Sequence, residues 1–73
     1  MAELVGTVLD VDAGTIDDSS SPTSVDGWDS LMHVSLIAAI EETYSVYFTA
    51  AEMRDATSVG ELRRLLKDKG VQV

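Results

Sequence analysis

The sequence lacks several residue types on which common functional sites depend. It contains no cysteine and a single histidine, His33, among 73 residues. Without cysteine there are no disulfide bridges, thiolate metal sites or thiol nucleophiles, and one histidine cannot form a multi-histidine metal site. No apolar run approaches the roughly 18 residues of a membrane span, and the first residues do not resemble a secretory signal. We therefore expect a cytoplasmic protein with no bound metal.

Positive charge is also missing from most of the chain. The 13 acidic and 5 basic residues give a formal net charge of −8, and residues 1–53 contain no lysine or arginine. A field of this sign repels the phosphates of nucleic acids and anionic lipids. We therefore expect no nucleic-acid partner and no membrane insertion, but instead protein partners that carry basic patches. The acidic residues could equally serve only to keep a small protein soluble.

The length and composition indicate one small folded domain, residues 1–73. Apolar residues make up 45% of the sequence and charged residues 25%, which is typical of a globular protein rather than a disordered one. A chain of 73 residues has little room for a deep catalytic cleft. Nothing in the sequence indicates an obligate dimer, so a monomer is expected.

Apolar residues recur every three or four positions in three stretches, which is the pattern of amphipathic helices. A short additional helix is indicated by Thr49 and Glu52, which form a capping box, a hydroxyl followed three residues later by a carboxylate. Residues 13–27 are rich in Ser, Asp and Gly and form a long first loop, with Ile16 and Val25 as its apolar anchors. The predicted helices lie at about 2–12, 30–44, 50–55 and 58–69.

The first stretch allows a second interpretation. Val5, Thr7 and Leu9 also fit the two-residue period of a strand. No other stretch offers a partner strand, and a single strand leaves its backbone groups unpaired, so a helix is the better interpretation. The expected fold is therefore all-α: a small four-helix bundle with three main helices, one short helix and a long first loop. Leu31 and Val34 are among the apolar residues expected to line any cleft inside it.

The segment Gly27-Trp28-Asp29-Ser30-Leu31 is the one place that suggests chemistry. A glycine turn leads into a helix that begins at Asp29 and Ser30, with Trp28 packed against the helices and Leu31 anchoring the turn in the core. A serine in this position is commonly an N-cap. The free N–H groups and partial positive charge of a helix N-terminus could instead accommodate a phosphate attached to Ser30. Ser30 is therefore a candidate attachment point.

The motif and its surroundings resemble the acyl carrier protein family. Asp29-Ser30-Leu31 is similar to the motif that opens the second helix in that family, and Ile40-Glu41-Glu42 resembles the acidic end of the same helix. The resemblance covers essentially the whole chain. It implies a four-helix carrier with no catalytic residues, in which a phosphopantetheinyl transferase moves 4′-phosphopantetheine from coenzyme A onto Ser30. It also implies that Asp29 and Leu31 flank the attachment site, and that the thiol of the arm holds an acyl group as a thioester.

The exposed face of the second helix departs from the pattern of fatty acid carriers. Such carriers usually have acidic residues where this chain has Met32 and Ser35. The resemblance therefore favours a discrete carrier of a specialised pathway over the housekeeping carrier, although the cargo could belong to fatty acid, polyketide or related biosynthesis. The implied partners are an acyl-activating ligase or acyltransferase, a ketosynthase or other carrier-dependent enzymes. The residues expected to contact them are Met32, His33, Glu41 and Glu42.

Three other functions fit parts of the sequence. An aminoacyl or peptidyl carrier has the same fold, but such domains often have glycine or histidine before the serine, where this chain has Asp29. A carrier-like bundle that is never modified would serve only as an interaction module. Ser30 and His33 lie three residues apart, so a hydrolase with a Ser–His dyad is also conceivable. A bundle of this size has little from which to build the oxyanion hole that such an enzyme needs.

Overall fold

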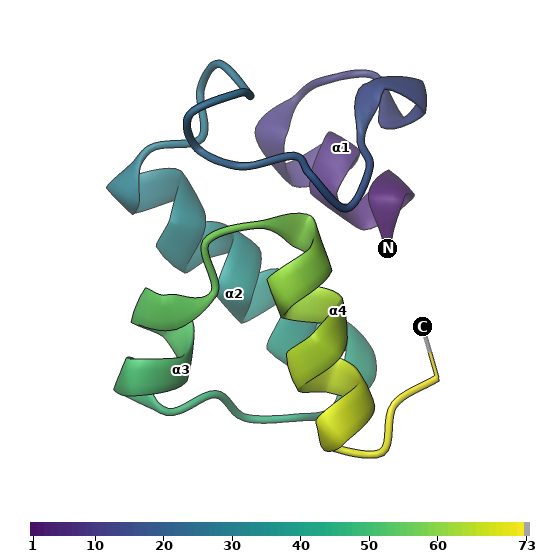
Figure 1. Cartoon of the computed structure of the whole chain (residues 1–73), viewed down its shortest axis with the longest axis vertical. Coiled ribbons are helices and arrows are strands. Elements are labelled where there is room, and N and C mark those ends of the chain that lie inside the picture. The colour runs from purple at the N-terminus through teal and green to yellow at the C-terminus, as the bar shows by residue number, and fades with distance from the viewer. Residues whose placement is uncertain (73) are drawn as a thin grey trace.

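Four α-helices and one turn of 3-10 helix make up the computed structural model, which describes residues 1–72 (Figure 1). Val73, the last residue of the expected domain, lies outside the described residues. No strand occurs among residues 1–72, so the prediction of an all-α bundle with one short helix is confirmed. None of these helices is long and apolar enough to span a membrane. The elements are α1 (Ala2–Leu9), η1 (Ala13–Thr15), α2 (Ser30–Tyr44), α3 (Ala50–Asp55) and α4 (Val59–Asp68).

Helix α1 ends at Leu9, earlier than the expected end near residue 12. Asp10 takes the left-handed conformation, with φ 58° and ψ 48°, and its N–H group donates to the carbonyl of Gly6. Val11 donates to the same carbonyl, so the chain turns back over the helix. A Cβ at Gly6 would lie 2.8 Å from the Val11 carbonyl oxygen. The close approach of the chain at a glycine therefore sets the end of α1, a feature that helical periodicity does not reveal.

The long first loop is fixed to the first turn of α4. The backbone N–H groups of Val59 and Gly60 donate to the carbonyl oxygens of Ser20 and Asp18, both at 2.9 Å. Ser20 is buried, and the Asp18 carboxylate forms an ion pair with Arg63. These bonds satisfy amide groups that a helix N-terminus otherwise leaves free. The loop is therefore an ordered wall of the bundle.

Helices α2, α3 and α4 begin at side-chain caps. The bounds of α2 and α3 are those expected, and α4 is one residue shorter at each end. The Thr49 hydroxyl accepts from the Glu52 N–H at 3.1 Å, and the Glu52 carboxylate accepts from the Thr49 N–H at 2.9 Å, which completes the expected capping box. Ser58 caps α4, since its hydroxyl accepts from the Glu61 N–H. Short polar residues therefore start these helices where the sequence indicates.

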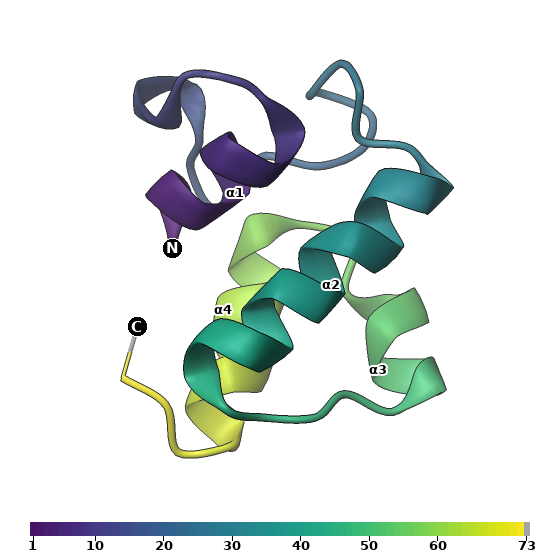
Figure 2. The same cartoon turned by 180° about the vertical axis from the view of Figure 1, so that it is seen from behind.

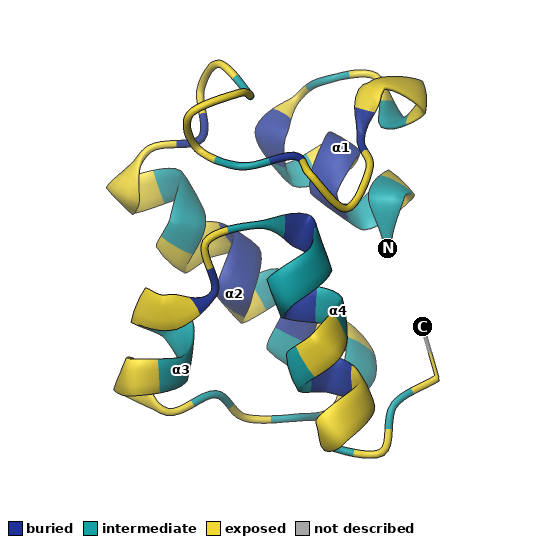
Figure 3. Ribbon diagram, viewed as in Figure 1, coloured by how far each residue is buried: buried dark blue, intermediate teal, exposed yellow. Residues whose placement is uncertain are grey.

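Helices α1, α2 and α4 supply most of the buried residues (Figure 3). Ile16 and Trp28 add to this core from the first loop. Seen from behind, α2 crosses in front of α4, with α3 beside its first half (Figure 2). Trp28 is 2% exposed, so the expectation that it packs against the helices is confirmed. The buried residues of α2, namely Leu36, Ile37 and Ile40, all lie beyond its first six residues. The first turn of α2 therefore contributes no fully buried residue and is free to form a site.

Candidate functional site

The N-terminus of α2 places the candidate serine on the surface. Asp29 is the N-cap of the helix, because its Oδ1 accepts from the Met32 N–H at 2.9 Å. Ser30 is therefore the first helical residue and not the cap. It is exposed, and its hydroxyl forms no hydrogen bond within residues 1–72. Gly27, with φ 88°, makes the turn into the helix, and the buried Trp28 holds that turn against the core.

Leu31 and Val34 do not enter the core, so the prediction that Leu31 anchors the turn there was wrong, and Val34 lines an open groove rather than a cleft inside the bundle. Leu31 is 74% exposed and Val34 53% exposed. Residues three or four apart share one side of a helix, and these two face away from the buried side. Apolar residues surround most of α2, so their spacing alone could not select its buried face. The exposed, uncharged residues at the start of α2 are called the outer strip below, and they are Ser30, Leu31, Val34, Ser35 and Ala38.

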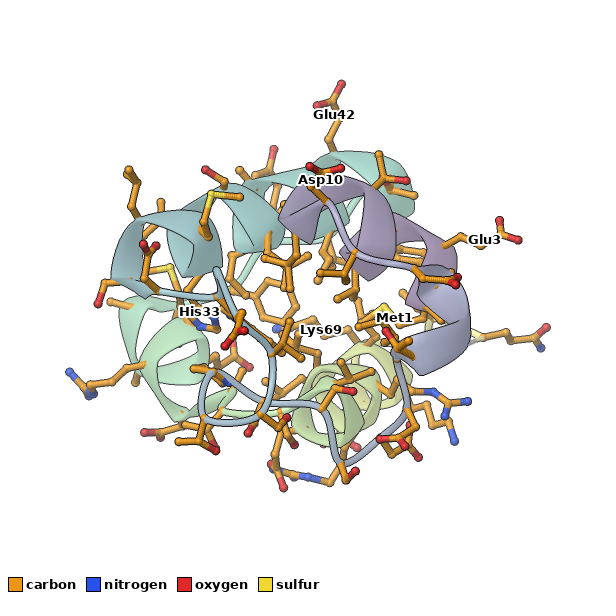
Figure 4. All side chains as sticks on the ribbon, turned by 90° about the horizontal axis from the view of Figure 1, so that it is seen from above. Met1, Glu3, Asp10, His33, Glu42 and Lys69 are labelled. Atoms are coloured by element: carbon orange, nitrogen blue, oxygen red, sulfur yellow. The ribbon has the colours of Figure 1, made fainter. Side chains whose placement is uncertain are left out.

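Of the four residues expected to contact partners, only Glu42 is classed as exposed, and it points away from the bundle (Figure 4). Met32 is half-buried and packs against the core. Glu41 is also half-buried, and its carboxylate accepts from the Phe48 N–H at 2.8 Å, which ties the end of α2 to the following segment. Partner contacts by Met32, Glu41 and His33 are thus limited to the parts of their side chains that remain exposed.

His33 is half-buried and connects the start of α2 with α3. Its Nδ1 accepts from the Trp28 Nε1–H at 3.1 Å, and its Nε2 lies 2.7 Å from the Met53 carbonyl oxygen. A carbonyl oxygen can only accept, so Nε2 is the donor in the bond to Met53. The imidazole also stacks on the indole, with ring centroids 6.0 Å apart.

This bridge engages the histidine that the hydrolase alternative requires. Both nitrogens of His33 are engaged, one by Trp28 and the other by Met53. A general base must be within hydrogen-bonding reach of the hydroxyl whose proton it takes, and Ser30 forms no hydrogen bond with His33. The Ser–His dyad that the sequence spacing suggests is therefore absent from the structure.

A groove of about 540 Å³ runs beside Ser30. Its walls come from the start of α2, from α3 and the residues that follow it, and from Pro22 in the first loop. The bridge of Trp28, His33 and Met53 forms part of its lining. Arg54 also lines it, and this residue is the only lysine or arginine among residues 1–62. The groove thus places one cation and a largely apolar surface next to the candidate attachment point.

Comparison with known families accounts for this arrangement. A family model described as a phosphopantetheine attachment site matches residues 1–66. The chain belongs to this family of carrier domains. The carrier domain is also similar to the solution NMR structure of holo acyl carrier protein from Geobacter metallireducens, with a TM-score of 0.83 and 31% sequence identity. That match covers 93% of this chain and 78% of the other. No curated protein sequence gives a significant match.

The group held by the carrier domain is therefore 4′-phosphopantetheine, bound covalently. Members of the family carry intermediates rather than convert them, and they work with a phosphopantetheinyl transferase and with biosynthetic enzymes. The residues present fit this group, because Ser30 offers an exposed hydroxyl without internal partners beside an open groove. No cluster of three or more potential metal ligands occurs in the described part of the chain.

Sequence reasoning missed two contributions to this site. Arg54 lines the groove, and the sequence did hold a signal for it, since it is the one basic residue that does not lie in the last stretch of helix. Met53 contributes its backbone carbonyl to the bridge with His33. A backbone carbonyl leaves no mark in the sequence, so only the path of the chain after α2 could reveal it.

Proposed function

We propose that Ser30 carries the 4′-phosphopantetheine arm and that the domain presents an acyl intermediate, held on that arm as a thioester, to successive enzymes of a biosynthetic pathway. The observation that carries this proposal is the state of Ser30. It is the first residue of α2, it is exposed, and no group within residues 1–72 binds its hydroxyl. The cap at Asp29 and the buried Trp28 hold it in a fixed position.

In the attachment step the Ser30 Oγ loses its proton and forms a bond to phosphorus, while adenosine 3′,5′-bisphosphate leaves from coenzyme A. The carrier supplies the nucleophilic oxygen, and His33 does not take its proton, because His33 is engaged with Trp28 and Met53. We assign the base to the transferase. The α2 N-terminus favours the anionic product, since its free N–H groups carry a partial positive charge.

The outer strip is the surface that partner enzymes contact. Its side chains are apolar or hydroxylic, and charge occurs only at its ends, at Asp29 and Glu42. Apolar contact therefore contributes more to docking here than ion pairs do, which supports a discrete carrier of a specialised pathway. An aminoacyl or peptidyl carrier is the alternative, and loading with a panel of acids and amino acids by candidate ligases separates the two.

Intact-protein mass spectrometry tests the proposal. The protein is incubated with coenzyme A, magnesium and a promiscuous phosphopantetheinyl transferase, beside Ser30→Ala and Ser35→Ala. Ser35 is the matched control, because it is also an exposed serine of α2. The wild type and Ser35→Ala should each gain one phosphopantetheine, and Ser30→Ala none. If the wild type gains no phosphopantetheine with several transferases, the proposal fails. An unmodified interaction module is then the better interpretation.

A further inference from the structure

Arg54 stands apart from most of the other basic residues of the protein. Arg63, Arg64 and Lys69 form ion pairs, with Asp18, Glu61 and Glu52 respectively. Arg54 forms no ion pair and no side-chain hydrogen bond within residues 1–72, although the chain has a net charge of −8. It is exposed, and it lines the groove beside Ser30. An unpaired guanidinium in so acidic a protein is available to an anion from outside the polypeptide.

The groove has the character that such an anion and its attached chain require. Val34, Met53 and Ala56 give it an apolar lining. Both His33 nitrogens in this lining are already engaged, one by the Trp28 indole and the other by the Met53 carbonyl. A phosphopantetheine arm has a phosphodiester at the serine, then a gem-dimethyl group and two amides. The lining thus suits the apolar part of the arm, and Arg54 is the cation available for its charge.

The Asp29 carboxylate strengthens the need for this cation. Asp29 also lines the groove and precedes Ser30 directly. Its carboxylate accepts from the Met32 N–H, so it stays beside the attachment point. An anion on Ser30 would be repelled by Asp29 unless a positive group lies nearby. A guanidinium meets this need well, because it can donate two parallel hydrogen bonds to a phosphate or a carboxylate.

We propose that Arg54 anchors an anionic group of the prosthetic arm in this groove, either the phosphodiester beside Ser30 or a carboxylate at the end of the cargo. This inference rests on the proposed function, since it requires an arm on Ser30. In this state the arm lies against the carrier. A partner enzyme must replace the contact between the arm and Arg54 with contacts of its own. Arg54 is therefore a positioning residue.

The experiment compares Arg54→Gln, Arg54→Lys and Lys67→Gln as holo-proteins. Lys67 is the matched control, because it too is an exposed base without an ion pair in residues 1–72, but it lies on α4 and does not line the groove. The ³¹P resonance of the phosphodiester and the amide resonances of Met53 and Thr57 are recorded for each protein. The same amide spectra are then taken with an acetyl cargo and with a malonyl cargo, which ends in a carboxylate.

If Arg54 binds the phosphodiester, Arg54→Gln should shift the ³¹P resonance by more than its line width, with Arg54→Lys between it and the wild type. If Arg54 binds a cargo carboxylate, the amides should differ between malonyl and acetyl forms in the wild type and not in Arg54→Gln. Lys67→Gln should change neither. The inference is overturned if Arg54→Gln and Lys67→Gln have the same effect in all forms. Mass spectrometry of each sample shows that the arm is present, so this failure is distinct from failure of the attachment at Ser30.

Discussion

Helices α2 and α4 both bury one side in the core, but they differ in what they expose on the other side. Helix α4 buries Val59, Leu62 and Leu66 on one side and carries charged residues on the other, and most of those charges are paired. Helix α2 also has one buried side, but its opposite side exposes Leu31 and Val34. Most charges on the exposed side of α4 therefore find partners within the domain, whereas the exposed side of α2 leaves apolar surface uncovered.

From this contrast we expect the exposed side of α4 to serve stability and the exposed side of α2 to contact partners. Isolated exposed apolar residues are common on proteins, but Leu31 and Val34 lie together beside Ser30. A clustered apolar surface on a soluble domain is typical of a site that a partner covers. Replacing buried residues of α4 should thus lower the free energy of unfolding. Replacing residues of the outer strip should instead weaken binding to partner enzymes.

The largest expected effect comes from a matched pair of leucines. Leu62→Ala removes a side chain that is 0% exposed, which typically costs about 2–5 kcal/mol of the free energy of unfolding. Leu31→Ala removes one that is 74% exposed, so the free energy of unfolding should change by less than about 0.5 kcal/mol. Urea unfolding measures both values.

In a functional assay, Leu31→Ala should have the larger effect of the two substitutions. Leu31→Ala should lower kcat/KM of the phosphopantetheinyl transferase for the carrier by about 5–30-fold, which corresponds to the loss of about 1–2 kcal/mol of docking energy. A carrier with Leu31→Ala that is destabilised by more than 2 kcal/mol, or modified at the wild-type rate, would show that the outer strip is not a partner surface.

The bridge at His33 should contribute the next largest effect. His33→Ala leaves the buried Trp28 indole N–H and the Met53 carbonyl without partners, which should cost about 1–3 kcal/mol of unfolding free energy. Trp28→Phe removes only the indole donor and leaves the Met53 bond intact, so it separates the two hydrogen bonds. Equal stability of His33→Ala and the wild type would show that water replaces the imidazole in both contacts.

The same two helices show how far the sequence determines the fold and the site. For α4 the caps, the spacing and the charged residues all agree, and its bounds differ from the predicted ones by one residue at each end. For α2 the bounds were predicted correctly, but the placement of Leu31 and Val34 on its buried face was not, because apolar residues occur on both sides. The choice between the faces depends on what α1 and α4 cover, and periodicity within one helix does not contain that information.

The candidate site was predictable to a similar extent. The serine at a helix start was evident from Gly27 and the motif that follows. Which residue caps the helix was not, because aspartate and serine are almost equally good N-caps and stand next to each other. The role of His33 depends on a carbonyl from α3, twenty positions away along the chain. Contacts of that kind follow from the tertiary structure alone.

The cap at Asp29 should make a smaller contribution to stability. Asp29→Ala removes the acceptor for the Met32 N–H and should cost about 1 kcal/mol of unfolding free energy. Asp29→Asn keeps a good N-cap and loses only the charge, so its stability should stay close to that of the wild type. If the transferase recognises the carboxylate itself, Asp29→Asn should be modified slowly although it is stable. Modification of Asp29→Asn at the wild-type rate would limit Asp29 to capping.

The smallest expected effect concerns Glu52, which links α3 to the end of α4. Its carboxylate accepts from the Thr49 N–H and from Lys69 Nζ, and these hydrogen bonds lower its pKa below the ordinary value of 4.5. A carboxyl group whose pKa is lower in the folded state stabilises the fold above its unfolded pKa, and this stabilisation is lost as the pH falls through the folded pKa. Glu52→Gln should therefore be less stable than the wild type at neutral pH, although glutamine preserves the capping box.

The difference between these two proteins should shrink as the pH falls below 4.5 and should vanish once Glu52 is protonated in both states. Thermal unfolding at a series of pH values measures it. Glu42→Gln is the control for the loss of one negative charge, because Glu42 is exposed and has no hydrogen-bond or ion-pair partner in residues 1–72. A constant difference across the whole pH range would mean that Glu52 acts through packing, and the link between α3 and α4 would then not depend on its charge.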